Sequence, residues 1–264
     1  MHVEMRMSFE NKKAFTLLEL LVVIAIIAML TAIIMPALAK ARRQGKAVFC
    51  LSNLRQLYIA AATYTETNDD SFPIAYYETT TDTGTIRYNW DFTVTDDGAN
   101  ITVTAGILWQ GDTIDKVQQC PSFKGDSNSP YDPYTGYNYN TSYIGHGQYE
   151  DITAPAKKSR VRNSAGCVLF GDGQWSGGAN KFMRSPLRAP GDRTFNGRYA
   201  GTQGYRHSDK TNVVWADGHA VSFKKLFTTV EPSRRIADIE EYNETNKRRK
   251  IGFLSPDNSA YDLK

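Results

Sequence analysis

The most regular pattern along the chain is an uninterrupted apolar run near its start. Residues 15–39 read FTLLELLVVIAIIAMLTAIIMPALA, with Glu19 as the only charged side chain. About 20 apolar residues in a helix are enough to cross a bilayer. The run therefore predicts one membrane-spanning helix. Within it, Glu19 needs a partner, because an isolated charge costs roughly 2.5–3.5 kcal/mol at the bilayer centre.

Helical spacing continues beyond this run. Small and apolar residues recur every three or four positions as far as residue 64, and Asn68 to Ser71 then interrupt the pattern. We expect a helix over residues 15–64 whose second half packs through one stripe, made of Leu38, Ala41, Gly45, Val48, Leu51, Leu54, Tyr58, Ala61 and Tyr64. Pro36 is expected to kink the helix, since proline lacks a backbone donor and clashes with the preceding turn.

After Phe72 the pattern changes to short β-branched or apolar runs separated by turn residues. Three runs are strand candidates, at residues 101–104, 167–170 and 212–215. Asp217-Gly218 lies between two alternating runs and predicts a hairpin turn. Asp172-Gly173 is expected to form a similar turn, and residues 124–148 are expected to be surface loop.

Composition excludes several classes of protein. With 264 residues and 41% apolar content, the chain is long enough to bury a core, so disorder throughout is excluded. Its mean hydropathy is negative, which excludes a protein with many membrane spans. A net charge of +3 does not by itself indicate nucleic-acid binding. Three cysteines are too few for a scaffold built on disulfides.

Three interpretations of the apolar segment compete. A secretory signal has the basic start that Lys12-Lys13 supplies and a cleavage site like the one at residues 37–39, but its apolar core is only about 7–15 residues long. A simple anchor fits the length and leaves Glu19 unexplained. Basic residues lie on both sides of the segment, so charge does not fix its orientation. The third interpretation depends on a resemblance.

Residues 12–19, KKAFTLLE, resemble the start of type IV prepilins and type II secretion pseudopilins. The resemblance implies that a membrane peptidase cuts between Ala14 and Phe15 on the cytoplasmic side and methylates the new N-terminus at Phe15. Ala14 stands where the family usually has glycine. In the assembled filament, the Glu19 carboxylate would pair with the terminal ammonium of a neighbouring subunit, so that two buried charges compensate each other.

The soluble part of the chain, after the apolar run, resembles a bacterial prepilin subfamily, abundant in planctomycetes, with a His-x9-Asp-Gly element near its C-terminus. Here His207 is followed after nine residues by Asp217-Gly218, and further matching segments lie at residues 50–57, 72–73, 120–122 and 137–139. The resemblance implies an α+β fold, with a long N-terminal helix on a small antiparallel sheet with long loops. The expected organisation is a leader (1–14), a filament-core helix (15–39), the soluble half of that helix (40–66), a globular domain (67–230) and a charged, partly helical tail (231–264).

Few residues suggest chemistry. We expect Asp217 to cap its own turn and His207 to bond to backbone, and we expect no enzyme, because no catalytic motif is present. Because the chain has only four histidines, we do not expect a dedicated zinc site. We expect no cofactor. Calcium is the alternative, with Asp172 and Asp217 as candidate ligands, since some pseudopilins bind it near the C-terminus.

The cysteines have different expected roles. Cys50 and Cys120 are a disulfide candidate, because an exported domain lies where disulfides persist. The bridge would close a loop of roughly 70 residues and contribute about 4 kcal/mol in the entropy model. Cys167 lies in an apolar run and is expected to be a buried free thiol. Other pairings remain open.

These resemblances imply a structural subunit of a secretion pseudopilus or pilus-like filament. Its partners would be the prepilin peptidase, other pilin subunits, an assembly ATPase and a membrane platform, and no nucleic acid. It would lie in the bacterial inner membrane with its N-terminus cytoplasmic and its domain outside. The alternatives are an anchored binding domain, for carbohydrate for example, that never polymerises, and a soluble hydrolase released by cleavage after Ala39.

Overall fold

The computed structural model describes residues 16–111, 116–127, 129–147, 150–175, 178–193, 201–228 and 250–264. The chain divides into two compact units, Met1–Arg42 and Arg43–Lys264. One helix, α1 (Leu17–Thr67), begins in the first unit and ends in the second. The α+β class expected from the sequence is confirmed, with α1 packed on sheets that are almost entirely antiparallel.

The C-terminus of α1 lies where the break in the pattern predicts it. The Asn68 side-chain amide donates to the carbonyl of Tyr64 at 2.9 Å and so satisfies one of the last carbonyls of the helix. Asp69 and Asp70 then take positive φ angles of 50° and 61°, which aspartate tolerates better than most residues. The chain leaves the helical path at this point.

The buried face of the second half of α1 overlaps the expected stripe at Leu54 and Ala61 and is shifted from it elsewhere. Its buried residues are Cys50, Asn53, Leu54, Leu57, Ala61 and Thr65. Val48, which we placed on the buried stripe, is 66% exposed. The spacing of three or four fits two overlapping stripes of this helix, and packing against the sheets selects the one that includes Cys50 and Leu57.

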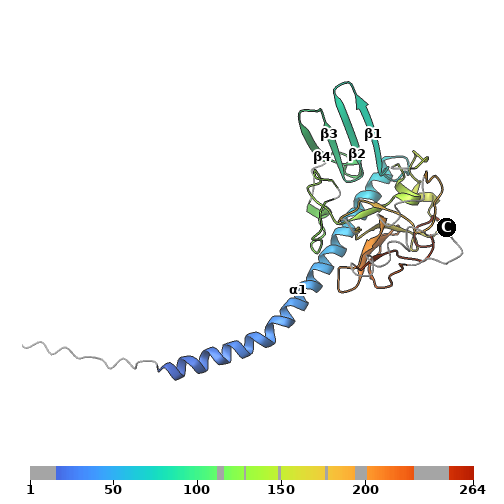
Figure 1. Ribbon diagram of the computed structural model, residues 1–264. Coiled ribbons are helices and arrows are strands. Elements are labelled where there is room, and N and C mark those ends of the chain that lie inside the picture. The colour runs from blue at the N-terminus through green and yellow to red at the C-terminus, as the bar shows by residue number, and fades with distance from the viewer. Residues whose placement is uncertain are drawn as a thin grey trace, which may run out of the picture. The chain divides into compact units, whose positions relative to one another are not determined.

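A four-stranded meander makes up the first sheet, in the order β1-β2-β3-β4 (Figure 1). Its strands are β1 (Tyr76–Thr81), β2 (Gly84–Asn89), β3 (Phe92–Asp96) and β4 (Ile101–Ala105). The last contains the first strand candidate. Tyr77 and Tyr88 face each other across β1 and β2 and stack with ring centroids 4.4 Å apart. Gly84 closes the first hairpin at φ 150°, where a Cβ atom would collide with the Asp96 carbonyl oxygen.

The second sheet has the order β10-β9-β6-β5-β7. It contains β5 (Asn138–Asn140), β6 (Val168–Gly171), β7 (Phe182–Met183), β9 (Thr211–Trp215) and β10 (Ala220–Phe223). β6 and β9 confirm two strand candidates, and β9 and β10 form the hairpin expected around Asp217-Gly218. The β5–β7 pair is parallel. A third sheet pairs β8 (Gln203–Gly204) with β11 (Ile251–Gly252).

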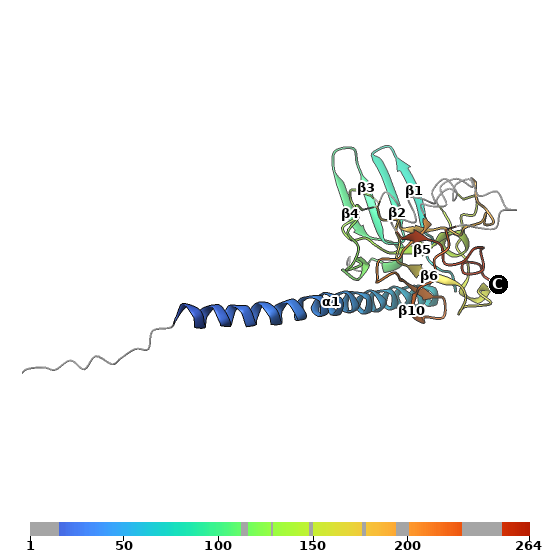
Figure 2. The same cartoon turned by 60° about the horizontal axis from the view of Figure 1, so that its bottom comes forward.

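The main core lies between the second half of α1 and the five-stranded sheet. β6 and β10 lie beside this part of the helix (Figure 2), and Leu54 and Leu57 belong to one apolar cluster with Leu169 and Val214. Aromatic rings extend this cluster: Tyr139 and Phe170 stack at 4.9 Å, and Trp90 lies 5.3 Å from Phe170. Short helical turns complete the domain: η1 (Ile107–Trp109), η2 (Lys116–Gln118), η3 (Thr141–Gly145) and η4 (Lys158–Arg160).

Three expectations are wrong in this unit. Residues 124–148 are not all surface loop, because β5 and most of η3 are buried. Asp172-Gly173 is not a hairpin turn, because Asp172 is fully buried beside β9. Residues 250–264, which we assigned to a charged tail, contain β11 and bury Ile251 and Tyr261 in the domain. Residues 231–249 of that tail lie outside the described residues.

Candidate functional site

The first unit presents apolar side chains that the described chain does not cover. Large aliphatic residues from Leu17 to Leu38 are exposed by 44–83%. This part of α1 is long and apolar enough to cross a membrane by length and composition. Exposed apolar surface on this scale calls for lipid or other protein, because its transfer from water is favourable.

The start of α1 forms a capping box. Thr16 precedes the first helical residue, and its hydroxyl accepts a hydrogen bond from the backbone amide of Glu19 at 3.2 Å. In return, the Glu19 carboxylate accepts from the backbone amide and the hydroxyl of Thr16, both at 2.9 Å. The signature Thr-x-x-Glu was present in the sequence and was missed there. Glu19 therefore has partners within its own chain.

The other residues predicted to matter in this segment are Ala14, Phe15 and Pro36. Ala14 and Phe15, the expected cleavage and methylation site, lie outside the described residues. Pro36 lies inside α1 without ending the helix. The expected kink stays a prediction.

The His-x9-Asp-Gly element is divided between the two ends of one strand. His207 precedes a turn in which Ser208 and Asp209 have positive φ angles, β9 follows, and Asp217 lies in the turn after it. Five extended residues span about 17 Å, so the nine-residue spacer separates His207 from Asp217. Asp217 accepts from the backbone amide of His219 at 3.0 Å and caps its own turn. The two residues do not form an acid–base pair.

His207 instead belongs to a buried polar cluster that the sequence analysis did not predict. It consists of Cys50 from α1, Cys120 after η2, Asp172 after β6, and Arg206 and His207 after β8. The two thiols are brought together with their Sγ atoms 3.9 Å apart, and both are free. His207 Nε2 lies 3.2 Å from Asp172 Oδ2 and 3.7 Å from Cys120 Sγ, so this side chain meets the cluster and not backbone.

Arg206 holds the cluster from one side. Its guanidinium donates to Asp172 Oδ1 at 3.0 Å, to Cys120 Sγ at 3.2 Å and to the carbonyl of Gly136. It also lies 5.2 Å from the ring centre of Phe123. Asp172 receives a further bond from the backbone amide of Asn212 at 2.7 Å. The buried carboxylate is thus compensated by a cation and by hydrogen bonds.

These neighbours shift the pKa values of the cluster. Burial raises the pKa of Cys50 well above its ordinary value. Burial opposes ionisation of Cys120 too, but hydrogen bonding with Cys50 and the Arg206 charge lower its pKa well below the ordinary value. His207 is also buried, yet Asp172 and Cys120 raise its pKa to about 9. Cys120 is therefore the thiol most easily ionised in this cluster.

The remaining sequence candidates are separate from one another. Asp172 and Asp217, the calcium candidates, lie at opposite ends of β9, so one ion does not bridge them. Cys167 is a buried free thiol outside the cluster, with its Sγ 3.4 Å from the carbonyl of Tyr261. The disulfide between Cys50 and Cys120 stays a prediction.

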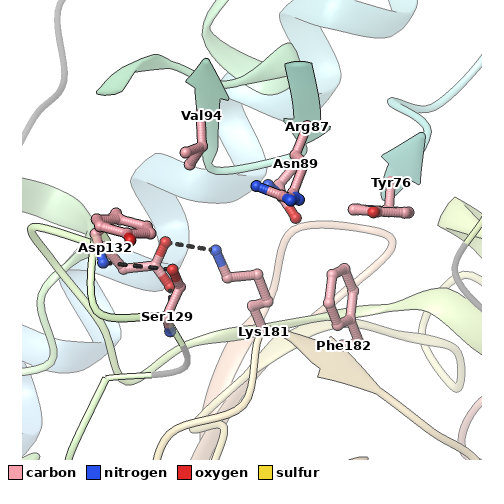
Figure 3. A pocket seen from close by; sticks show the side chains of 9 residues that line it. Tyr76, Arg87, Asn89, Val94, Ser129, Asp132, Lys181 and Phe182 are labelled. Atoms are coloured by element: carbon pink, nitrogen blue, oxygen red, sulfur yellow. Dashed lines mark hydrogen bonds and ion pairs between the residues drawn. The ribbon is translucent and has the colours of Figure 1, made fainter. Parts of the chain in front are cut away.

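A second buried charge cluster lies at a pocket of about 350 Å³ between the two sheets (Figure 3). Lys181 Nζ lies 2.8 Å from Asp132 and 3.1 Å from Asp91. Burial raises the pKa of Asp91 to about 6, although the Lys181 charge opposes this shift. The ammonium is already paired with both carboxylates, so this cluster offers little to a ligand.

Comparisons with known proteins concern the N-terminal segment. Residues 10–35 match the family model described as the prokaryotic N-terminal methylation motif. No curated protein and no solved structure matches the chain. The match indicates a pilin- or pseudopilin-type precursor that prepilin peptidase processes, and the exposed apolar half of α1 fits a membrane-anchored protein of this type.

Proposed function

We propose that this protein is a non-enzymatic structural subunit, a pseudopilin or minor pilin, of a secretion pseudopilus or pilus-like filament. The observation that carries the proposal is the combination of the methylation motif with an apolar helix half that the described chain leaves exposed. In the filament, neighbouring helices of this kind would cover each other. An assembly ATPase and a membrane platform would drive this step, with the domain outside the inner membrane.

Glu19 would provide register in this assembly. In the free subunit its carboxylate is satisfied by Thr16. Cleavage between Ala14 and Phe15 would create an ammonium group one residue before Thr16. The Glu19 carboxylate of a neighbouring subunit would then compensate that charge in a low-dielectric helix bundle.

The test separates the charge of Glu19 from its capping role. Glu19→Gln keeps a side chain that can close the capping box and removes only the charge. Thr16→Ala removes the hydroxyl and leaves the charge. If the charge sets the register, Glu19→Gln should abolish recovery of the subunit in sheared filaments, while Thr16→Ala should reduce it only slightly.

Membrane fractionation and N-terminal mass spectrometry provide the controls. Both variants should enter the membrane and carry N-methylated Phe15 as their first residue. Incorporation of Glu19→Gln at the wild-type level would contradict the role of the charge in register. Absence of the wild type from sheared filaments would contradict the filament role and favour the anchored binding domain. A wild-type N-terminus at Lys40 would instead identify a released soluble domain.

A further inference from the structure

We propose that Cys50, Cys120, Asp172 and His207 form a structural zinc site that fastens the second half of α1 to the sheets of the domain. The donor atoms of these four residues lie within 4.8 Å of one another, and all four residues are buried. They come from four separate segments, three of which follow η2, β6 and β8. The proposal does not depend on filament assembly.

Three separations between the donor atoms fit a tetrahedral ion. A fourth, from Cys50 Sγ to Asp172 Oδ1 at 3.0 Å, is shorter than a tetrahedral edge, because the Cys50 thiol donates a hydrogen bond to that oxygen. Zinc binds sulfur at about 2.3 Å and imidazole nitrogen at about 2.0–2.1 Å, so a tetrahedron places two sulfurs about 3.8 Å apart and sulfur and nitrogen about 3.5 Å apart. The corresponding distances are 3.9 Å between Cys50 and Cys120 and 3.7 Å between Cys120 and His207. The distance between His207 Nε2 and Asp172 Oδ2 is 3.2 Å, close to the nitrogen–oxygen separation of about 3.4 Å that a tetrahedral zinc ion would give.

The orientation of His207 supports the same conclusion. Its Nδ1 atom is buried and has no hydrogen-bond partner among the described residues, so the polar contacts of the ring all run through Nε2 into the cluster. A neutral imidazole with its proton on Nδ1 would present a lone pair on Nε2 at the centre of the four donors.

Charge and ligand type favour zinc over calcium at this site. Two thiolates and the Asp172 carboxylate carry three negative charges, and Arg206 together with a divalent cation balances them in a buried site. Soft thiolates with imidazole favour zinc, whereas calcium prefers oxygen donors alone. Arg206 donates to both Cys120 and Asp172, which is the role of the outer residues that orient metal ligands.

The zinc site and the expected disulfide are mutually exclusive states of one cysteine pair. A disulfide would use Cys50 and Cys120 alone and would leave Asp172 paired only with Arg206 and His207. The ion would use all four residues and would satisfy both thiols without oxidation. The donor set therefore favours the metal, against the expectation drawn from the small number of histidines.

The experiment measures metal content of the full chain purified from membranes in detergent, reduced, loaded with zinc sulfate and dialysed. We expect one zinc per chain in the wild type and almost none in Cys50→Ser or Cys120→Ser. Cys167→Ser is the matched control, because it removes a buried thiol outside the cluster, and it should retain the ion. Arg206→Gln should keep the stoichiometry and lose about 10–100-fold in affinity.

A second measurement does not depend on any variant folding. Replacing zinc by cobalt(II) in the wild type should give the strong visible bands of a tetrahedral ion and a thiolate-to-metal charge-transfer band. The proposal is overturned if the wild type, purified without reductant or chelator, has no zinc and a mass lower by two hydrogen atoms, which identifies the disulfide. Equal loss of zinc in Cys167→Ser, or a cobalt spectrum without thiolate bands, would also overturn it.

Discussion

The two halves of α1 have the same secondary structure and different surroundings. Up to residue 42, none of its described residues is buried. From residue 43 to its end, the helix buries six residues, and two of them, Asn53 and Thr65, are polar. The first half, which contains the long apolar run, is therefore the exposed one. Apolar content alone does not predict what covers a helix: the second half is covered by its own domain, and the first half needs other molecules.

The largest expected difference between the halves concerns folding stability. Leu54 is fully buried and Ile27 is 56% exposed, and both can be shortened to alanine. Leu54→Ala should lower the free energy of unfolding of the domain by about 2–5 kcal/mol, because it leaves a cavity. Ile27→Ala should leave it unchanged. Denaturant unfolding of the full chain in detergent measures the stability of both variants. Equal losses of unfolding free energy would contradict the difference between the two halves of α1.

Membrane insertion should depend on the first half of α1 and not on the second half. Ile27→Lys places a charge in the middle of the apolar run and should cost roughly 2.5–3.5 kcal/mol on insertion scales. Val48→Lys, at a position 66% exposed in the second half, should have no effect. Carbonate extraction followed by immunoblotting measures the retained fraction. Full retention of Ile27→Lys would show that residues 15–39 are not the anchor.

The smallest expected effect is a pH dependence confined to the domain. The folded-state pKa of Asp91 is about 6, above its ordinary value of 3.8, so the folded chain binds more protons than the unfolded chain between these values. This group should therefore lower stability as pH rises from about 4 to 6. Asp91→Asn should remove that decrease, while Lys181 keeps Asp132 as its partner.

Denaturant unfolding at pH 4, 5, 6 and 7 tests this prediction, with the wild type as reference at each pH. The free energy of unfolding of Asp91→Asn, taken relative to that of the wild type, should increase as the pH rises. Membrane retention should not change, because Asp91 lies in the second unit. A constant difference across the series would mean that the pKa of Asp91 is not raised in the folded chain.

Local signals in the sequence were sufficient for α1 and for the β9–β10 hairpin, because helical spacing and the dipeptide Asp217-Gly218 act over a few residues. The same reasoning extends to the turn between β3 and β4, where Asp97-Gly98 carries an identical signal that was not used. β5 and β11 were missed because they have three and two residues and depend on their partner strands.

The buried cluster was not predictable from spacing. Cys50 is separated from Cys120, Asp172 and His207 by long segments, and no short motif contains two of the four. Only the pairing of β6 with β9 and the packing of α1 bring them together. The resemblance drew attention to His207 and Asp217 as one element, whereas the fold gives the histidine a partner in Asp172.

The capping box at the start of α1 also has a consequence for disassembly. In the proposed filament, Glu19 would exchange its two bonds from Thr16 for an ammonium group of a neighbour, and a departing subunit would regain those bonds. Neither state leaves a bare carboxylate in an apolar environment. Addition and removal of a subunit would then be a nearly balanced exchange of hydrogen-bond and ion-pair partners at this residue.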